Sequence, residues 1–135
     1  MVKAVRAVRG ATQIEVDERE HLLERTRELI AQVMEANGLT SDDFVSIIFT
    51  ATGDVNSAFP AVAARELGMT DVPLMCAREL EIDGSLPRAV RLMAHVETEL
   101  ARQDVRHVYL HGAVVLRPDL AGPTGGGTPA ADVPG

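Results

Sequence analysis

The pattern of apolar and polar positions predicts five β-strands. They are expected at residues 2–12, 44–51, 72–77, 89–98 and 105–110. Partial alternation in the first strand indicates one buried face, whereas the second is apolar or β-branched at nearly every position, which is typical of a central strand covered on both faces. In the fourth strand Arg91 falls on the polar side of the alternation, so its side chain is predicted to point away from the apolar face.

Two helices are predicted between these strands. Apolar residues keep helical spacing from Leu22 to Met34, and Gly38 ends the series. Asp17 and Glu20, just before it, have the spacing of a capping box. A second, short helix is expected in the alanine-rich residues 60–68, which begin with proline and end with glycine.

The chain has the size of one ordinary globular domain. It contains 135 residues and no internal repeat, and the domain is expected to occupy residues 1–120. Within it, residues 111–116 form a short continuation of the last strand whose form the pattern leaves open. Glycine and proline are frequent in residues 121–135, which predicts a flexible C-terminal tail.

Composition and charge argue against several classes of partner. The net charge of -7 disfavours a nucleic-acid surface, and aromatic residues at 3 % with no tryptophan disfavour a platform for stacking bases. No apolar run approaches the roughly 20 residues that a membrane-spanning helix needs. Cys76 is the single cysteine, and no basic and apolar leader is seen, so a cytoplasmic location is expected. The four histidines lack metal-ligand spacing with Cys76, so no metal is expected.

Arginine is the one residue type whose use suggests a chemistry. Twelve arginines stand against the single Lys3, which fits either a GC-rich genome or the bidentate recognition of carboxylates. Taken alone, Arg9 and Arg91 would more often be solvated residues on a strand. Cys76 would more often be a small buried hydrophobic residue. Tyr109 could simply lie at the edge of the core. Composition does not choose between these interpretations.

Several short segments, taken together and in order, point to one family. They are Val8–Thr12, Thr50–Thr52 with Asp54, Phe59–Ala61, Val72–Glu79, Arg91, and Arg106–Leu120. This series resembles the small monofunctional chorismate mutases of the AroH class. The resemblance covers about the first 120 residues, including the amphipathic helix that follows the first segment.

The resemblance implies both an architecture and an activity. The subunit is expected to be a mixed α/β (α+β) fold with helices outside a mixed sheet, and to assemble as a homotrimer with a barrel-like core and active sites at the subunit clefts. The implied reaction is the Claisen rearrangement of chorismate to prephenate, an isomerase step of the shikimate pathway toward phenylalanine and tyrosine. It uses no cofactor, no metal and no covalent intermediate.

The family pattern also implies roles for four catalytic residues. Arg91 matches the arginine at the breaking ether oxygen, and Arg9 matches one that holds a carboxylate. Glu79 matches the acid that accepts the ring hydroxyl, and Tyr109 the phenol that donates to a carboxylate. Cations suit this chemistry because they grip carboxylates in a near-attack geometry and stabilise the charge that develops as the ether bond breaks.

Further substrate-binding residues follow from the same pattern. Cys76 is expected near the ring hydroxyl, Phe59 and Leu116 in the cavity wall, and Arg65 and Arg117 in the surrounding positive field or as anchors of the tail. The sequence departs from the pattern at two positions: Val62 stands where relatives often have lysine, and Met75 stands where they have a smaller polar residue.

The sequence is also compatible with two other functions. Trimeric deaminases of reactive imines share a similar architecture with an arginine at a subunit cleft, although their sequence signatures are not found. A non-catalytic sensor would use the same arginines to bind a dianion without turnover. Incubation with chorismate distinguishes these functions from a mutase.

Overall fold

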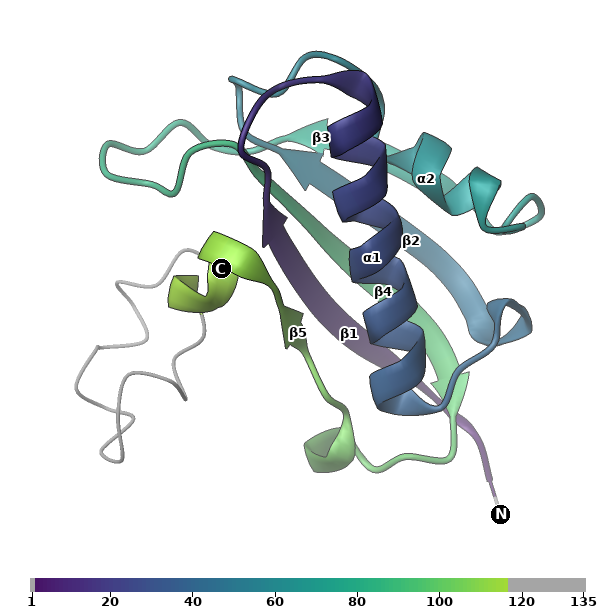
Figure 1. Ribbon diagram of the computed structural model, residues 1–135. Coiled ribbons are helices and arrows are strands. Elements are labelled where there is room, and N and C mark those ends of the chain that lie inside the picture. Colours follow the sequence, from purple (N-terminus) through teal and green to yellow (C-terminus); the bar gives the residue numbers. More distant parts are fainter. Residues whose placement is uncertain (1, 117–135) are drawn as a thin grey trace, which may run out of the picture.

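A mixed five-stranded sheet with helices on one face forms the subunit (Figure 1). The computed structural model describes residues 2–116. Its strands are β1 (Ala4–Gln13), β2 (Phe44–Ala51), β3 (Leu74–Arg78), β4 (Ala89–Thr98) and β5 (Val108–Tyr109). Its helices are α1 (Arg19–Asn37) and α2 (Ala61–Glu66), with three short 3-10 helices: η1 (Ser41–Asp43), η2 (Arg102–Asp104) and η3 (His111–Leu116). The mixed α+β fold expected from the sequence is confirmed.

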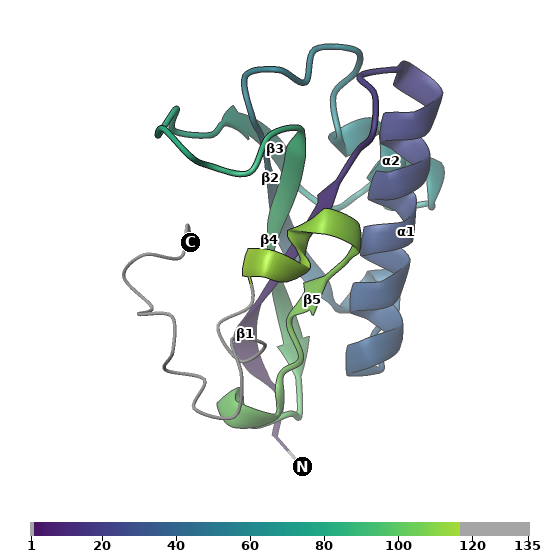
Figure 2. The same ribbon diagram turned by 60° about the vertical axis from the view of Figure 1, so that its left-hand side comes forward.

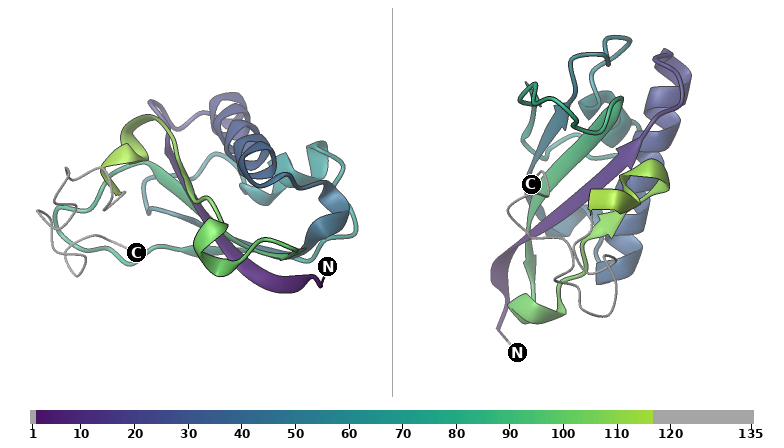
Figure 3. Two further views of the ribbon diagram at one scale, coloured as in Figure 1. Left: turned by 90° about the horizontal axis from the view of Figure 1, so that it is seen from below. Right: turned by 90° about the vertical axis from the view of Figure 1, so that its left-hand side faces the viewer.

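The strand order is β3-β2-β4-β1-β5, with β4 at the centre. β4 runs antiparallel to both β1 and β2, whereas β3 is parallel to β2 and β5 is parallel to β1. Figures 2 and 3 show α1 and α2 on the same side of this sheet, and we call the other side the open face. Neither helix of the described region is long and apolar enough to cross a membrane.

The alternation in β4 separates the core from the open face. Its bounds are those predicted from the sequence. The side chains that point toward the helices are buried: Val90, Leu92, Ala94 and Val96. The alternate positions, occupied by Arg91, Met93, His95 and Glu97, are intermediate or exposed. The predicted direction of the Arg91 side chain is therefore confirmed.

β2 corrects one prediction. Its bounds match the prediction, but it lies second from the sheet edge and is covered on one face only. Ile47 and Phe49 are buried under the helices, whereas Val45 and Ile48 on the open face are 43 % and 36 % exposed. The apolar pattern was typical of a doubly covered strand, but a single subunit supplies no second layer to cover the open face.

The start of α1 corrects a second prediction. The residue before the helix, Glu18, makes no capping hydrogen bond through its side chain, so Asp17 and Glu20 do not form a capping box. The Asp17 carboxylate instead accepts the backbone N–H groups of Asn56 and Ser57, at 2.8 and 3.1 Å. Burial would raise the pKa of Asp17, but hydrogen bonds from Ser57 and Asn56 hold it below its usual value. Asp17 thus fastens the loop after β2 to the start of α1.

The sequence pattern predicted the end of α1 correctly but overestimated the length of the last strand. Gly38 ends the helix with a left-handed backbone at φ 63°, as predicted. The strand expected at residues 105–110 is reduced to Val108 and Tyr109, because only Gly10 and Ala11 of β1 pair with it. Residues 111–116 turn into η3. The predicted flexible tail lies outside the described residues.

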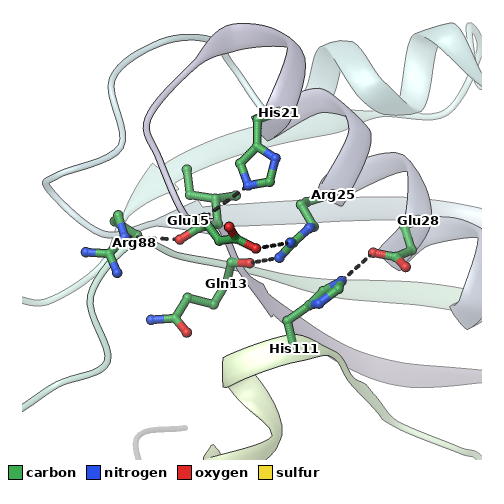
Figure 4. Close-up of polar contacts among 8 residues, drawn as sticks. Gln13, Glu15, His21, Arg25, Glu28, Arg88 and His111 are labelled. Carbon is green, nitrogen blue, oxygen red and sulfur yellow. Dashed lines mark hydrogen bonds and ion pairs between the residues drawn. The ribbon is translucent and has the colours of Figure 1, made fainter.

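A group of polar contacts ties η3 and the end of β1 to α1 (Figure 4). The Arg25 guanidinium donates to the backbone oxygen of Gln13 at 2.7 Å and pairs with Glu15 at 2.9 Å. One turn further along α1, Glu28 contacts Nε2 of His111 at 2.8 Å. These contacts hold η3 beside the end of β1, on the chain segment that follows Tyr109.

The close approach of η3 to β1 gives a stability prediction. A Cβ atom added at Gly112 would overlap Oε1 of Gln13. The Gln13 side chain would have to move and lose its 3.0 Å hydrogen bond to the backbone oxygen of Pro87. We expect Gly112→Ala to lower the free energy of unfolding by about 1 kcal/mol in denaturant titrations. The matched control is Gly112→Ala in a Gln13→Ala background, where the substitution should cost almost nothing; an equal cost in both backgrounds would contradict this account.

Candidate active site

A cavity of about 470 Å³ on the open face brings together the four residues expected to be catalytic. β1, β2, β4, β5 and the segment after β3 all line it, and Arg9, Glu79, Arg91 and Tyr109 are among its lining residues. Its volume lies within the range of roughly 300–1,000 Å³ that is usual for small-molecule sites. Apolar side chains, including Ile48, complete its walls.

Arg91 and Glu79 form a two-point ion pair in this cavity. Nη2 of Arg91 lies 2.6 Å from Oε1 of Glu79, and Nε lies 3.0 Å from Oε2. Both side chains are mostly buried, with exposures of 19 % and 14 %. Glu79 directly follows β3, and its backbone N–H donates to the Ala51 oxygen at 3.0 Å. The strand framework and the two hydrogen bonds therefore fix the plane of the guanidinium.

Arg9 and Tyr109 form the opposite wall of the same cavity. The parallel pairing of β1 and β5 places Ala11 beside Tyr109, two residues beyond Arg9. The guanidinium carbon of Arg9 lies 6.0 Å from the centre of the Tyr109 ring, at the outer limit of a cation–π contact. The cavity thus holds two guanidinium groups, one carboxylate and one phenol, a set suited to binding a small molecule with several carboxylate or hydroxyl groups.

The structure separates the remaining expected site residues from this cavity. Cys76 pairs with Phe49 in the β2–β3 register and packs against the core under the helices. It lines a second cavity, of about 510 Å³, together with the 70 % exposed Phe59. Arg65 is exposed on α2 and lines neither cavity.

The two C-terminal candidates are placed differently. Leu116 is buried in a small apolar cluster with Ala11 and Tyr109, behind the cavity wall. Arg117 lies outside the described residues. In the single subunit, therefore, four of the nine expected site residues converge, and Cys76, Phe59 and Arg65 lie outside the Arg91 cavity.

Comparison with known proteins identifies the family. Residues 5–120 match the family described as chorismate mutase type I. The chain belongs to this family. The chorismate mutase AroH of Thermus thermophilus is 50 % identical over 117 residues, which cover 86 % of this chain and 96 % of that one. The chorismate mutase AroH of Bacillus subtilis (strain 168) is 41 % identical over 118 residues, which cover 87 % and 93 % of the two chains.

A solved structure agrees with the fold of the family. A chorismate mutase from Clostridium thermocellum superposes with a TM-score of 0.80 at 45 % sequence identity, covering 81 % of this chain and 97 % of that one. The family resemblance and the mixed α+β architecture inferred from the sequence are thus both confirmed. The Arg91 cavity is accordingly a candidate for the mutase active site.

The sequence patterns assign no role to His107, a residue beside the cavity. Nδ1 of His107 accepts the backbone N–H of Arg9 at 3.0 Å, just before β5 pairs with β1. Burial, and then the positive charge of Arg9, lower the pKa of His107 below 6.5. The sequence offered only the position of His107 two residues before Tyr109. His107 thus supports the backbone that carries Arg9.

This contact predicts a pH dependence of stability. Because the pKa of His107 is lower in the folded than in the unfolded protein, protonation favours unfolding. The stabilisation is fully present above the ordinary value of 6.5 and is lost as the pH falls through the lowered folded value. The urea midpoint should therefore fall between about pH 7.5 and about pH 5. His107→Asn keeps an acceptor that does not titrate and should decline less; identical declines would show that His107 is not responsible.

Proposed function

We propose that the Arg91 cavity converts chorismate to prephenate by restricting the substrate's conformation and stabilising the breaking ether oxygen. The observation that carries this proposal is the two-point Arg91–Glu79 pair facing Arg9 and Tyr109 across one cavity. The cavity supplies cations for an anionic substrate and an acceptor for its hydroxyl group. Family membership supports the reaction, and the geometry supports the site.

Binding would first limit rotation of the substrate. Chorismate carries two carboxylates, and its enolpyruvyl arm must fold over the ring before the new carbon–carbon bond can form. Arg9 would hold one carboxylate, and the Tyr109 hydroxyl would donate to a carboxylate. Fixing the reacting ends near one another removes part of the activation entropy. This step lowers the barrier without any covalent contact between protein and substrate.

Arg91 would then act on the transition state. As the ether carbon–oxygen bond breaks, negative charge develops on the oxygen, and a fixed cation aimed at that atom stabilises the transition state more than the ground state. Glu79 would accept the ring hydroxyl and keep the guanidinium oriented. The rearrangement moves electrons within one molecule, so none of these residues transfers a proton.

We further propose that a neighbouring subunit completes the site in a homotrimer. The open face carries exposed apolar side chains, including Ile48, Met93 and the 62 % exposed Met75, as expected of a surface that another chain covers. We propose that a neighbour in that position brings its Phe59, Cys76 and Arg65 to the Arg91 cavity, while Leu116 supports the cavity wall from behind. Sedimentation equilibrium tests this directly: a monomeric mass at working concentrations would contradict the shared site.

The activity itself is tested by adding chorismate to the purified protein. Loss of the diene absorbance together with formation of prephenate, without added metal or cofactor, is the expected result. Prephenate would then serve phenylalanine and tyrosine synthesis, and we propose a cytoplasmic location for the enzyme. Chorismate binding without turnover would instead indicate a sensor of aromatic-pathway metabolites.

A further inference from the structure

We propose that Thr50 is a positioning residue for Glu79, holding its carboxylate in place when Arg91 directs its donors to the substrate. The proposal rests on the proposed function, because it matters only if Glu79 contacts the substrate. Thr50 lines the Arg91 cavity, and its hydroxyl donates to Oε2 of Glu79. The same oxygen accepts Nε of Arg91 at 3.0 Å.

The sheet places Thr50 between Arg91 and the segment that leads to Glu79. In the strand register it lies opposite Arg91 of β4 on one side and Ala77 of β3 on the other. Glu79 follows two residues after Ala77, so its side chain returns over the strand that carries Thr50. Since threonine is β-branched, few rotamers are open to it, and its hydroxyl is fixed by the strand. Glu79 has more side-chain torsions and depends on its partners for a single orientation.

In the proposed chemistry the Glu79 carboxylate needs a hydrogen-bond donor besides Arg91. Arg91 uses both Nε and Nη2 to hold Glu79. A substrate carboxylate and the ether oxygen would compete for this guanidinium, and Glu79 would lose part of its anchoring as the reaction begins. The proposed substrate contacts do not include the Thr50 hydroxyl, so its hydrogen bond to Glu79 is expected to remain while Arg91 turns to the substrate.

A purely structural role for Thr50 is the alternative. A β-branched residue suits a strand by packing alone, and its hydroxyl would then contribute nothing to turnover. Two substitutions separate these roles, because Thr50→Val keeps the branched shape and removes the donor, whereas Thr50→Ser keeps the donor and removes the methyl group. If the hydroxyl contributes to turnover, only Thr50→Val lowers kcat/KM. If packing of the methyl group is what contributes, Thr50→Ser lowers kcat/KM more than Thr50→Val does.

The test compares kcat/KM for chorismate across these variants of the full-length protein. We expect Thr50→Val to lose about tenfold, equivalent to about 1.4 kcal/mol, and Thr50→Ser to stay within about threefold of the unsubstituted enzyme. Ser46→Ala is the matched control, since it removes a hydroxyl from the same face of β2 that contacts His95, outside the Arg91 cavity. It should leave kcat/KM unchanged. Thermal unfolding of each variant establishes that it is folded.

A double-mutant cycle then shows whether Thr50 acts through Glu79. In a Glu79→Ala background, Thr50→Val should cost less than about twofold, because the carboxylate that it positions is gone. Prephenate affinity is a second readout of the cycle, measured by titration of the unsubstituted protein, the two single variants and the double variant. An undiminished loss in the Glu79→Ala background, or full activity of Thr50→Val, would overturn the proposal. Failure of the proposed function is seen separately, as no turnover by the unsubstituted protein.

Discussion

Replacing Arg91 with alanine is expected to lower kcat/KM for chorismate by a factor of about 10³, measured as the initial rate of chorismate loss. Removing one neutral donor to a developing oxyanion costs roughly 2.7–4 kcal/mol in other enzymes, and the Arg91 guanidinium is a charged donor. The loss should appear mainly in kcat, because the contact strengthens in the transition state.

Controls for this variant follow from the fold. Arg91→Ala should remain folded, because its side chain lies on the open face and Thr50 still donates to Glu79. Arg27→Ala removes an arginine from α1, where it pairs with Glu66 at 2.6 Å, and should leave kcat/KM unchanged. If Arg91→Ala retained activity within about tenfold, equivalent to roughly 1.4 kcal/mol, the role assigned to Arg91 would be wrong.

The second large effect is expected at Glu79. We expect Glu79→Ala to lower kcat/KM by about 10²-fold, because it removes the acceptor for the ring hydroxyl and releases the guanidinium of Arg91. A hydrogen bond to a charged group is worth about 1.5–3 kcal/mol, which accounts for a loss of this size. The same initial-rate assay measures it.

Glu81 provides the control for Glu79. Glu81 is exposed two residues further along the same segment and does not line the Arg91 cavity. Glu81→Ala should keep kcat/KM within about twofold, since it touches none of the proposed substrate contacts. Equal losses at the two positions would indicate a general effect of negative charge in the loop, and not a specific hydroxyl acceptor.

Elements with strong local signals were predictable from the sequence. The alternation in β4 fixed both its bounds and the direction of Arg91. The turn glycine Gly38 likewise defined the end of α1, because a left-handed residue there is a local property of the chain. The capping box predicted from the spacing of Asp17 and Glu20 was wrong, because the Asp17 carboxylate accepts hydrogen bonds from a loop about 40 residues away in the sequence. Capping patterns describe local preference, and tertiary contacts override them.

Local sequence patterns did not predict that the site residues come together in one cavity. Arg9, Glu79 and Arg91 come from different segments, and only the family resemblance linked them before the sheet register was known. That resemblance named Cys76 and Phe59 with the same site, whereas the subunit places them in another cavity. Thr50 and His107 belong to segments that carry the resemblance, but neither was assigned a role, because their contributions are hydrogen bonds across the sheet that no spacing within the chain reveals.

A crystal structure of the protein with prephenate bound would test directly whether the Arg91 cavity is the active site. Prephenate is expected to occupy the cavity between Arg91 and Arg9, with its carboxylates on guanidinium groups and its ring hydroxyl on Glu79. Prephenate bound elsewhere, with the Arg91–Glu79 cavity empty at saturating ligand, would contradict this assignment.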